Sequence, residues 1–197
     1  MPKVTDEYRE LKRREIADAA LRAFNRKGFR AASMADIIAE SGVSAGAIYG
    51  SFRNKADIVH AVAATTVNER ILAGEEFLGR DPLPTPGEVV GIMMRGVSVA
   101  VEKTDILVQL WGEAVTDPDL RVITQEIMDR IDDLYRRYLT RWYSQTRELP
   151  EAEAAELAVR FAPVLVSLSQ GFIIQSAIRE NFDGEAYLIA AAELFPL

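Results

Sequence analysis

Residues 33–55 constrain the fold of this 197-residue chain more than any other segment. Ser33 and Ser44 each precede a short run of helix-forming residues, where a serine side chain accepts a hydrogen bond from a free backbone N–H of the first turn. Gly42 stands between the two runs, where a tight turn favours a residue without a side chain. The pattern predicts a helix-turn-helix, whose second helix fits a DNA major groove.

The remainder of the chain is also predicted to be helical. Besides the two short helices, apolar residues recur at helical spacing at about 7–27, 54–79, 86–102, 104–115, 118–147, 151–180 and 184–195. No strand-like alternation of apolar and polar residues stands out. We expect an all-α protein of about nine helices, with a three-helix, homeodomain-like head at 1–55 and a larger helical body at 56–197.

Composition excludes several kinds of site. The chain has no cysteine, which rules out disulfides and thiolate zinc sites, and His60 is its only histidine. The sequence shows no phosphate-binding glycine loop and no nucleophile elbow. We therefore expect no enzyme, no metal site and no cofactor.

Charge divides the chain into two parts. The net charge is −7, but residues 1–55 carry 11 Lys and Arg against 7 Asp and Glu, which is +4, and residues 56–197 carry 12 against 23, which is −11. A basic head on an acidic body suits a protein that presents one face to phosphates. Both sets could also be ordinary solvated helix faces. The charged N-terminus carries no apolar signal segment, so we expect a cytoplasmic protein.

The order of residues around the turn resembles a known family. Residues 42–55 read Gly-Val-Ser-Ala-Gly-Ala-Ile-Tyr-Gly-Ser-Phe-Arg-Asn-Lys. They resemble the TetR family of bacterial transcriptional regulators, which typically shows Gly-Val-Ser-x-Gly-x-Leu/Ile-Tyr-x-x-Phe-x-x-Lys. Residues 14–29 look like the first helix of that family, and the close likeness covers about 12–58. Gly50 and Ser51 depart from it, because they replace a bulky aromatic or histidine pair that could touch bases.

Resemblance and residue chemistry predict the same DNA-contacting surface. The helix starts at Ser33 and Ser44 offer free N–H groups to phosphates, and Tyr49 and Lys55 are expected against the DNA backbone. Alanine and glycine leave little that can form bidentate base contacts, so DNA shape and half-site spacing should supply much of the preference. The candidate DNA-binding residues are Ser33, Met34, Ser44, Ala45, Gly46, Ala47, Tyr49, Gly50 and Lys55.

The resemblance also implies that the helical body encloses a pocket for a small-molecule effector. Large apolar walls with a few polar groups suit such a pocket, although methionines and aromatics at helical spacing are equally typical of an ordinary core. The candidate ligand-binding residues are Phe77, Met93, Met94, Gln109, Trp111, Tyr135 and Tyr138.

By analogy with the family we expect a homodimer, because two heads about one helical turn apart match a palindromic operator. The last two helices are the expected interface, with an intramolecular core as the alternative. The candidate interface residues are Leu157, Phe161, Leu165, Leu168, Phe172, Leu188, Ala192 and Phe195. The 18 uncharged residues between Arg160 and Arg179 approach the length of a membrane span. Pro163, Ser167 and Gln170 dilute that apolar run, so we expect a buried helix and no membrane.

The predicted function is a ligand-responsive transcriptional regulator. The resemblance implies a repressor, because most members of the family repress transcription. It would bind double-stranded DNA as a homodimer and be released by a small apolar or amphipathic effector. The alternative is a TetR-like adaptor that acts mainly through a protein partner, because Gly50 and Ser51 weaken the base-reading surface.

Overall fold

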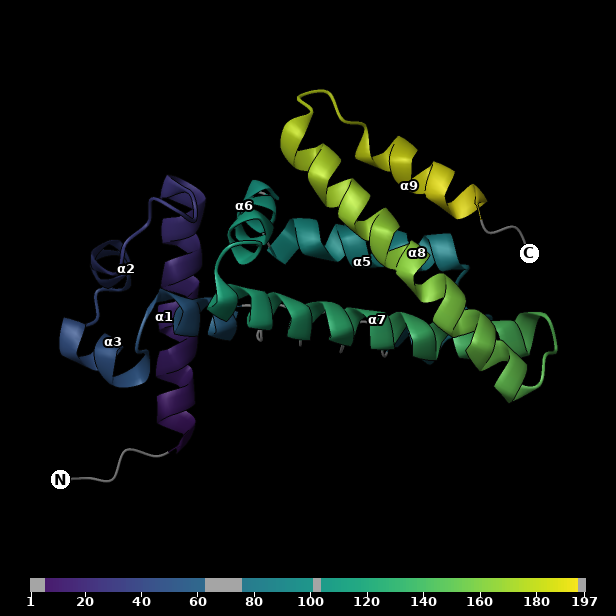
Figure 1. Cartoon of the computed structure of the whole chain (residues 1–197), viewed down its shortest axis with the longest axis horizontal. Helices are drawn as coiled ribbons and strands as arrows, with labels where there is room; N and C mark the ends of the chain where they lie inside the picture. Colours follow the sequence, from purple (N-terminus) through teal and green to yellow (C-terminus); the bar gives the residue numbers. More distant parts are fainter. Residues whose placement is uncertain (1–5, 63–75, 101–103, 195–197) are drawn as a thin grey trace. The chain divides into compact units, whose positions relative to one another are not determined.

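The computed structural model describes residues 6–62, 76–100 and 104–194, and every regular element in these ranges is an α-helix (Figure 1). The all-α prediction is confirmed. The helices are α1 (Asp6–Lys27), α2 (Met34–Ser41), α3 (Ala45–Ser51), α5 (Pro86–Ala100), α6 (Asp105–Ala114), α7 (Pro118–Thr146), α8 (Glu151–Ile178) and α9 (Gly184–Glu193), and residues 55–62 are helical as well.

The chain separates into two compact units. The first contains Met1–Val67 and Gln109–Thr124, and the second contains Asn68–Val108 and Gln125–Leu197. This division differs from the expected boundary at residue 55. The helix that starts at residue 55 extends the first unit, and Gln109 on α6 bonds to the backbone of Phe29 after α1. Helices α6 and α7 each have residues in both units.

The first unit is built on a stripe of small and apolar residues along α1. As the helical spacing predicts, one face of α1 is buried, and its buried residues are Ile16, Ala17, Ala19, Ala20, Ala23 and Phe24. The alanines let α2 approach closely, and Ile37 of α2 and Ile48 of α3 are both fully buried. Figure 1 shows these three helices grouped at the N-terminal end of the chain.

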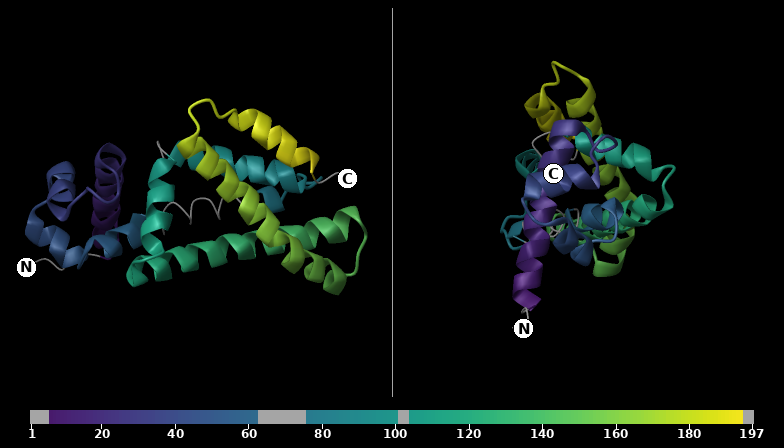
Figure 2. Two further views of the ribbon diagram at one scale, coloured as in Figure 1. Left: turned by 45° about the horizontal axis from the view of Figure 1, so that its top comes forward. Right: turned by 90° about the vertical axis from the view of Figure 1, so that its left-hand side faces the viewer.

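The second unit packs α5 against α8 and α9, which lie together in both views of Figure 2. At Gly87 an added Cβ would lie 2.1 Å from the Ala192 Cα, so any larger residue would push α5 off α9. At Gly171 an added Cβ would lie 2.8 Å from the Tyr187 hydroxyl, which donates to the Leu168 carbonyl at 2.7 Å. The absence of a side chain at Gly171 therefore makes room for Tyr187 of α9 against α8.

Buried tyrosines join α7 to its neighbours. The Tyr135 hydroxyl lies 2.8 Å from Ser169 Oγ on α8, and burial raises the pKa of Tyr135 to about 12. The Tyr138 hydroxyl donates to the Pro84 carbonyl at 2.5 Å, and its ring stands edge-on to Phe77 with centroids 5.7 Å apart. These bonds satisfy hydroxyl groups that would otherwise be costly to bury.

Candidate nucleic-acid interface

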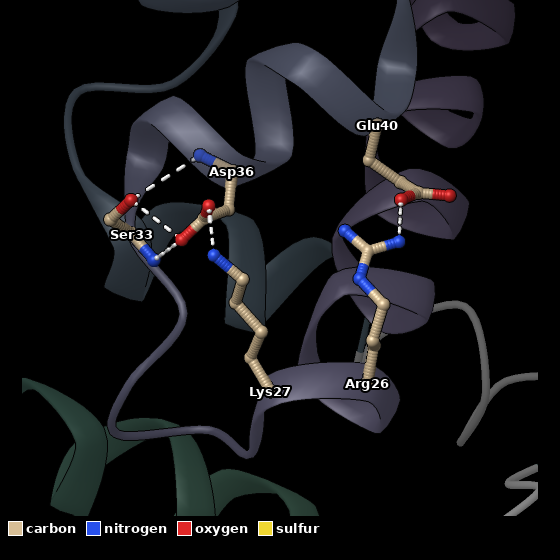
Figure 3. A network of polar contacts seen from close by, with 5 residues as sticks. All are labelled: Arg26, Lys27, Ser33, Asp36 and Glu40. Carbon is tan, nitrogen blue, oxygen red and sulfur yellow. Dashed lines mark hydrogen bonds and ion pairs between the residues drawn. The ribbon is translucent and has the colours of Figure 1, made fainter.

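The first helix of the predicted helix-turn-helix begins at a reciprocal cap. Ser33 Oγ accepts from the Asp36 N–H at 3.3 Å, and Asp36 Oδ2 accepts from the Ser33 N–H at 2.9 Å (Figure 3). This capping box satisfies two donors that a helix start leaves free. The predicted N-cap at Ser33 is confirmed, and Asp36 completes its capping box.

Ion pairs hold α2 against α1. Lys27 Nζ lies 2.6 Å from Asp36 Oδ1, Arg26 Nη1 lies 2.5 Å from Glu40 Oε2, and Arg22 Nε lies 3.2 Å from Glu40 Oε1. Figure 3 shows Lys27 and Arg26 reaching from α1 to the two acidic side chains of α2. The hydrogen bond from Lys27 and that from the Ser33 N–H hold the pKa of Asp36 well below its usual range. Several cations of the basic head therefore orient α2.

The turn and the start of α3 follow the predicted pattern. Gly42 has φ 65°, the left-handed conformation that favours glycine. Ser44 accepts from the Ala47 N–H at 3.4 Å, which makes it the N-cap of α3. Ile48 is buried in the core, so the opposite side of α3 faces solvent.

The exposed side of α3 carries almost no long side chains. Its exposed residues are Ala45, Gly46, Ala47, Tyr49 and Gly50, and Tyr49 is 54% exposed. An added Cβ at Gly46 or Gly50 would meet no atom of the protein within 4 Å. Internal packing therefore does not require glycine at either position. Ser33 and Ser44 are exposed as well, and Met34 is half-buried.

Lys55 lies differently from the expected phosphate contact. Its ammonium donates to the Phe29 carbonyl and lies 4.1 Å from the centroid of the Phe29 ring. Burial lowers the pKa of Lys55. The side chain holds the end of α1, so replacing it would disturb the fold of the first unit as well as any contact with DNA.

Two arginines that the sequence analysis did not select stand beside Tyr49. Arg13 Nη1 donates to the Ser51 carbonyl at 2.5 Å, and Arg53 binds Asp57 with Nε to Oδ2 at 2.9 Å. Both line a cavity of about 330 Å³ that also includes Tyr49 and Gly50. The signal for Arg53 was its place directly after the Phe52 of the motif, at a position that varies in the family pattern.

Comparison with known proteins agrees with this geometry. The family model described as "Bacterial regulatory proteins, tetR family" matches residues 16–62. The HTH-type transcriptional regulator AcrR of Shigella flexneri is 26% identical over 193 residues, which are 92% of this chain and 83% of that protein. Residues 16–62 therefore carry the DNA-binding region of the TetR family. Another relative, the HTH-type transcriptional regulator YfiR of Bacillus subtilis, is 37% identical over 68 residues, 34% of this chain and 33% of that protein.

Solved structures share the TetR-family fold over nearly the whole chain. A TetR-family transcriptional regulator from Agrobacterium tumefaciens is 17% identical with a TM-score of 0.70, covering 96% of this chain and 100% of that chain. The regulator FadR of Bacillus subtilis, solved in complex with stearoyl-CoA, is 19% identical with a TM-score of 0.66, covering 92% and 96%. At these identities the likeness shows the fold alone.

The candidate ligand-binding residues are divided between the two units of the chain. Phe77, Met93, Met94, Tyr135 and Tyr138 are buried in the second unit. Gln109 and Trp111 belong to the first unit, and Gln109 Oε1 accepts from the Phe29 N–H at 2.8 Å. In the described part of the chain, no group of three His, Asp or Glu side chains could hold a metal ion.

The structure divides the candidate dimer residues into buried and half-buried positions. Leu165, Phe172 and Leu188 are buried within one chain, and Leu157, Phe161, Leu168 and Ala192 are half-buried. Phe195 lies outside the described residues. Helical spacing identified an apolar stripe correctly, but this stripe of α8 packs against α5, α7 and α9.

Asp36→Asn tests the ion pair and capping box at α2. Because the native pKa of Asp36 is lowered, its contribution to stability is present above the ordinary carboxyl pKa of about 4 and is lost as pH falls through the native value. The urea midpoint of wild type should therefore exceed that of the variant at neutral pH, and the gap should narrow between about pH 5 and pH 3. Asp18→Asn, an exposed acid on α1, should follow wild type throughout. A gap independent of pH would contradict the assignment.

Proposed function

We propose that this chain is a ligand-responsive transcriptional regulator that docks α3 in the DNA major groove and binds a palindromic operator as a homodimer. The observation that carries the proposal is the exposed side of α3, which pairs small residues with one exposed tyrosine. Such a surface lets the helix backbone approach base edges closely, while Tyr49 and the helix starts can reach phosphates. Repression is the proposed sign of regulation.

The two glycines of α3 support close contact with DNA. A glycine inside a helix costs about 0.5–1 kcal/mol relative to alanine, because it loses more backbone freedom on folding. Neither Gly46 nor Gly50 is close to another part of the protein. Glycine at these two positions leaves room on the exposed side of α3 for atoms outside the chain, and a groove-bound DNA supplies them.

Gly50→Ala should separate stability from DNA binding. The added methyl group should stabilise the protein by about 0.5–1 kcal/mol, as judged from urea unfolding. It should weaken operator binding by roughly tenfold, the equivalent of about 1.4 kcal/mol. Gly112→Ala in α6, where an added Cβ also meets nothing within 4 Å, should gain stability and leave binding unchanged. If Gly50→Ala and Gly112→Ala bound the operator with equal affinity, the glycines of α3 would not support close contact with DNA.

Replacement of Tyr49 tests whether the exposed side of α3 contacts DNA. Duplexes selected by the protein from a random pool should contain two inverted half-sites about one helical turn apart. Tyr49→Ala should weaken binding to all selected duplexes alike, because the side chain is expected to contact the backbone. Tyr8→Ala, which removes a similarly exposed tyrosine from α1, is the matched control. A pool that yields no preferred sequence would favour the alternative, an adaptor that acts through a protein partner.

The homodimer is proposed to form on the face of α8 opposite its core. This face exposes the large apolar side chains of Val159, Val164, Ile174 and Ile178. Two more are exposed nearby in the chain, Ile189 on α9 and Leu194 directly after it. At about 100° per residue the exposed positions of α8 lie on the side away from Leu165 and Ser169. α8 is also the one helix in the described residues that is long and apolar enough to span a membrane. Burial against a second subunit accounts for its apolar surface, and we place the protein in the cytoplasm.

Ile174→Asp should convert the dimer to a monomer. A charge in the centre of a buried helix–helix interface is costly to desolvate, so association should be lost. The measurement is the mass of the full chain by light scattering, followed by operator affinity. Val115→Asp, at an exposed position in the first unit, should remain dimeric. A dimer that persists in Ile174→Asp would place the interface elsewhere.

The effector is proposed to bind in the second unit. Its buried aromatic residues offer apolar walls, and burial raises the pKa values of Tyr135 and Tyr138, so both hydroxyls stay neutral. The Trp142 indole N–H is buried and makes no hydrogen bond within the described structure. A neutral or amphipathic compound with one hydrogen-bond acceptor fits this chemistry. Stearoyl-CoA, bound in the solved FadR structure, is the first compound to test for release of the selected duplex.

A further inference from the structure

Side chains from two different elements hold both backbone groups of Phe29. The Phe29 N–H donates to Gln109 Oε1 on α6 at 2.8 Å, and the Phe29 carbonyl accepts from the ammonium of Lys55. Ala47 and Leu120 also have both backbone groups bonded to side chains, but those side chains lie within four residues of them in the sequence. The two partners of Phe29 lie 80 and 26 residues away, so they join distant parts of the chain. We call this pair of bonds the Phe29 clamp.

The Phe29 clamp acts where α1 passes into α2. Gly28 has φ 81°, and an added Cβ there would lie 3.0 Å from Gln109 Oε1, so the loop and the amide are tightly fitted. The Ala32 N–H donates to the Gly28 carbonyl at 3.2 Å, and Ser33 follows as the N-cap of α2. Only residues 30–32 therefore separate Phe29 from Ser33, where the helix-turn-helix begins.

A second side chain of α6 also reaches the loop after α1. Glu113 lies one turn after Gln109, and its Oε1 is 3.8 Å from Nε of Arg30, the residue after Phe29. This ion pair is exposed and contributes little energy. The Gln109 bond is half-buried and neutral, so it is screened less by salt and fixes the loop more strictly.

We infer that Gln109 is a positioning residue for DNA binding, which acts by holding the loop that sets the start of α2. Its acceptor oxygen is committed to Phe29, and the inference assigns it no contact with DNA. The inference rests on the proposed DNA-binding function and names a residue on α6, outside the helix-turn-helix, that controls it. Since α6 has residues in both units, the clamp ties the loop to a helix that leads into the second unit.

Gln109→Met tests the inference, because methionine keeps the size of the side chain and removes the acceptor. Loss of one hydrogen bond should weaken binding to the selected duplex by roughly three- to tenfold. The slope of affinity against salt should stay at the wild-type value, since no phosphate contact is removed. Amide exchange at Phe29 should accelerate. Gln109→Glu, which keeps an acceptor oxygen in place, should restore affinity and slow exchange.

Two controls make the outcomes distinct. Gln125→Met, at an exposed position on α7, should match wild type in every measurement. A merely structural role for Gln109 would lower the active fraction in a stoichiometric titration and leave the affinity of the folded protein unchanged, and that result would overturn the inference. Wild-type affinity in Gln109→Met would overturn it as well, with the proposed function intact. A wild-type chain that selects no duplex would overturn both.

Discussion

Asp36 accepts three hydrogen bonds at the start of α2, from the N–H and the hydroxyl of Ser33 and from the ammonium of Lys27. The first two define where α2 begins, and the third fixes it to the end of α1. The turn at Gly42 and the cap at Ser44 then set the direction of α3 relative to α2. The exposed side of α3 can face a DNA groove only because this start is held in place.

Basic residues in the first unit pair with acidic side chains and also bind a backbone carbonyl. Arg22, Arg26 and Lys27 pair with acids of α2, and Lys55 holds a backbone carbonyl. The positive charge of the head, taken from the sequence as attraction for phosphates, thus also supports the internal arrangement of its helices. Each exposed ion pair contributes little free energy, and the paired acids offset part of the positive charge of the first unit.

The long helix α8 carries two apolar faces. One packs within the protomer, through residues such as Leu165 and Phe172, and the other exposes Val164 and Ile174. A periodic apolar pattern shows that a helix has a buried stripe. It does not say which of two stripes meets the core, and for this reason three of the interface residues chosen from the sequence, Leu165, Phe172 and Leu188, are buried within the protomer.

The sequence by itself determined the elements and their ends. Serine before a helix, glycine in a left-handed turn and apolar spacing act over a few residues, so Ser33, Gly42 and the stripe on α1 were all predictable. Only the tertiary structure decided the partners of Gln109 and Lys55 and the direction in which each face of α8 points. Those contacts join residues far apart in the chain, from Phe29 to Gln109 and from α7 to α8, and no local pattern encodes which distant groups meet.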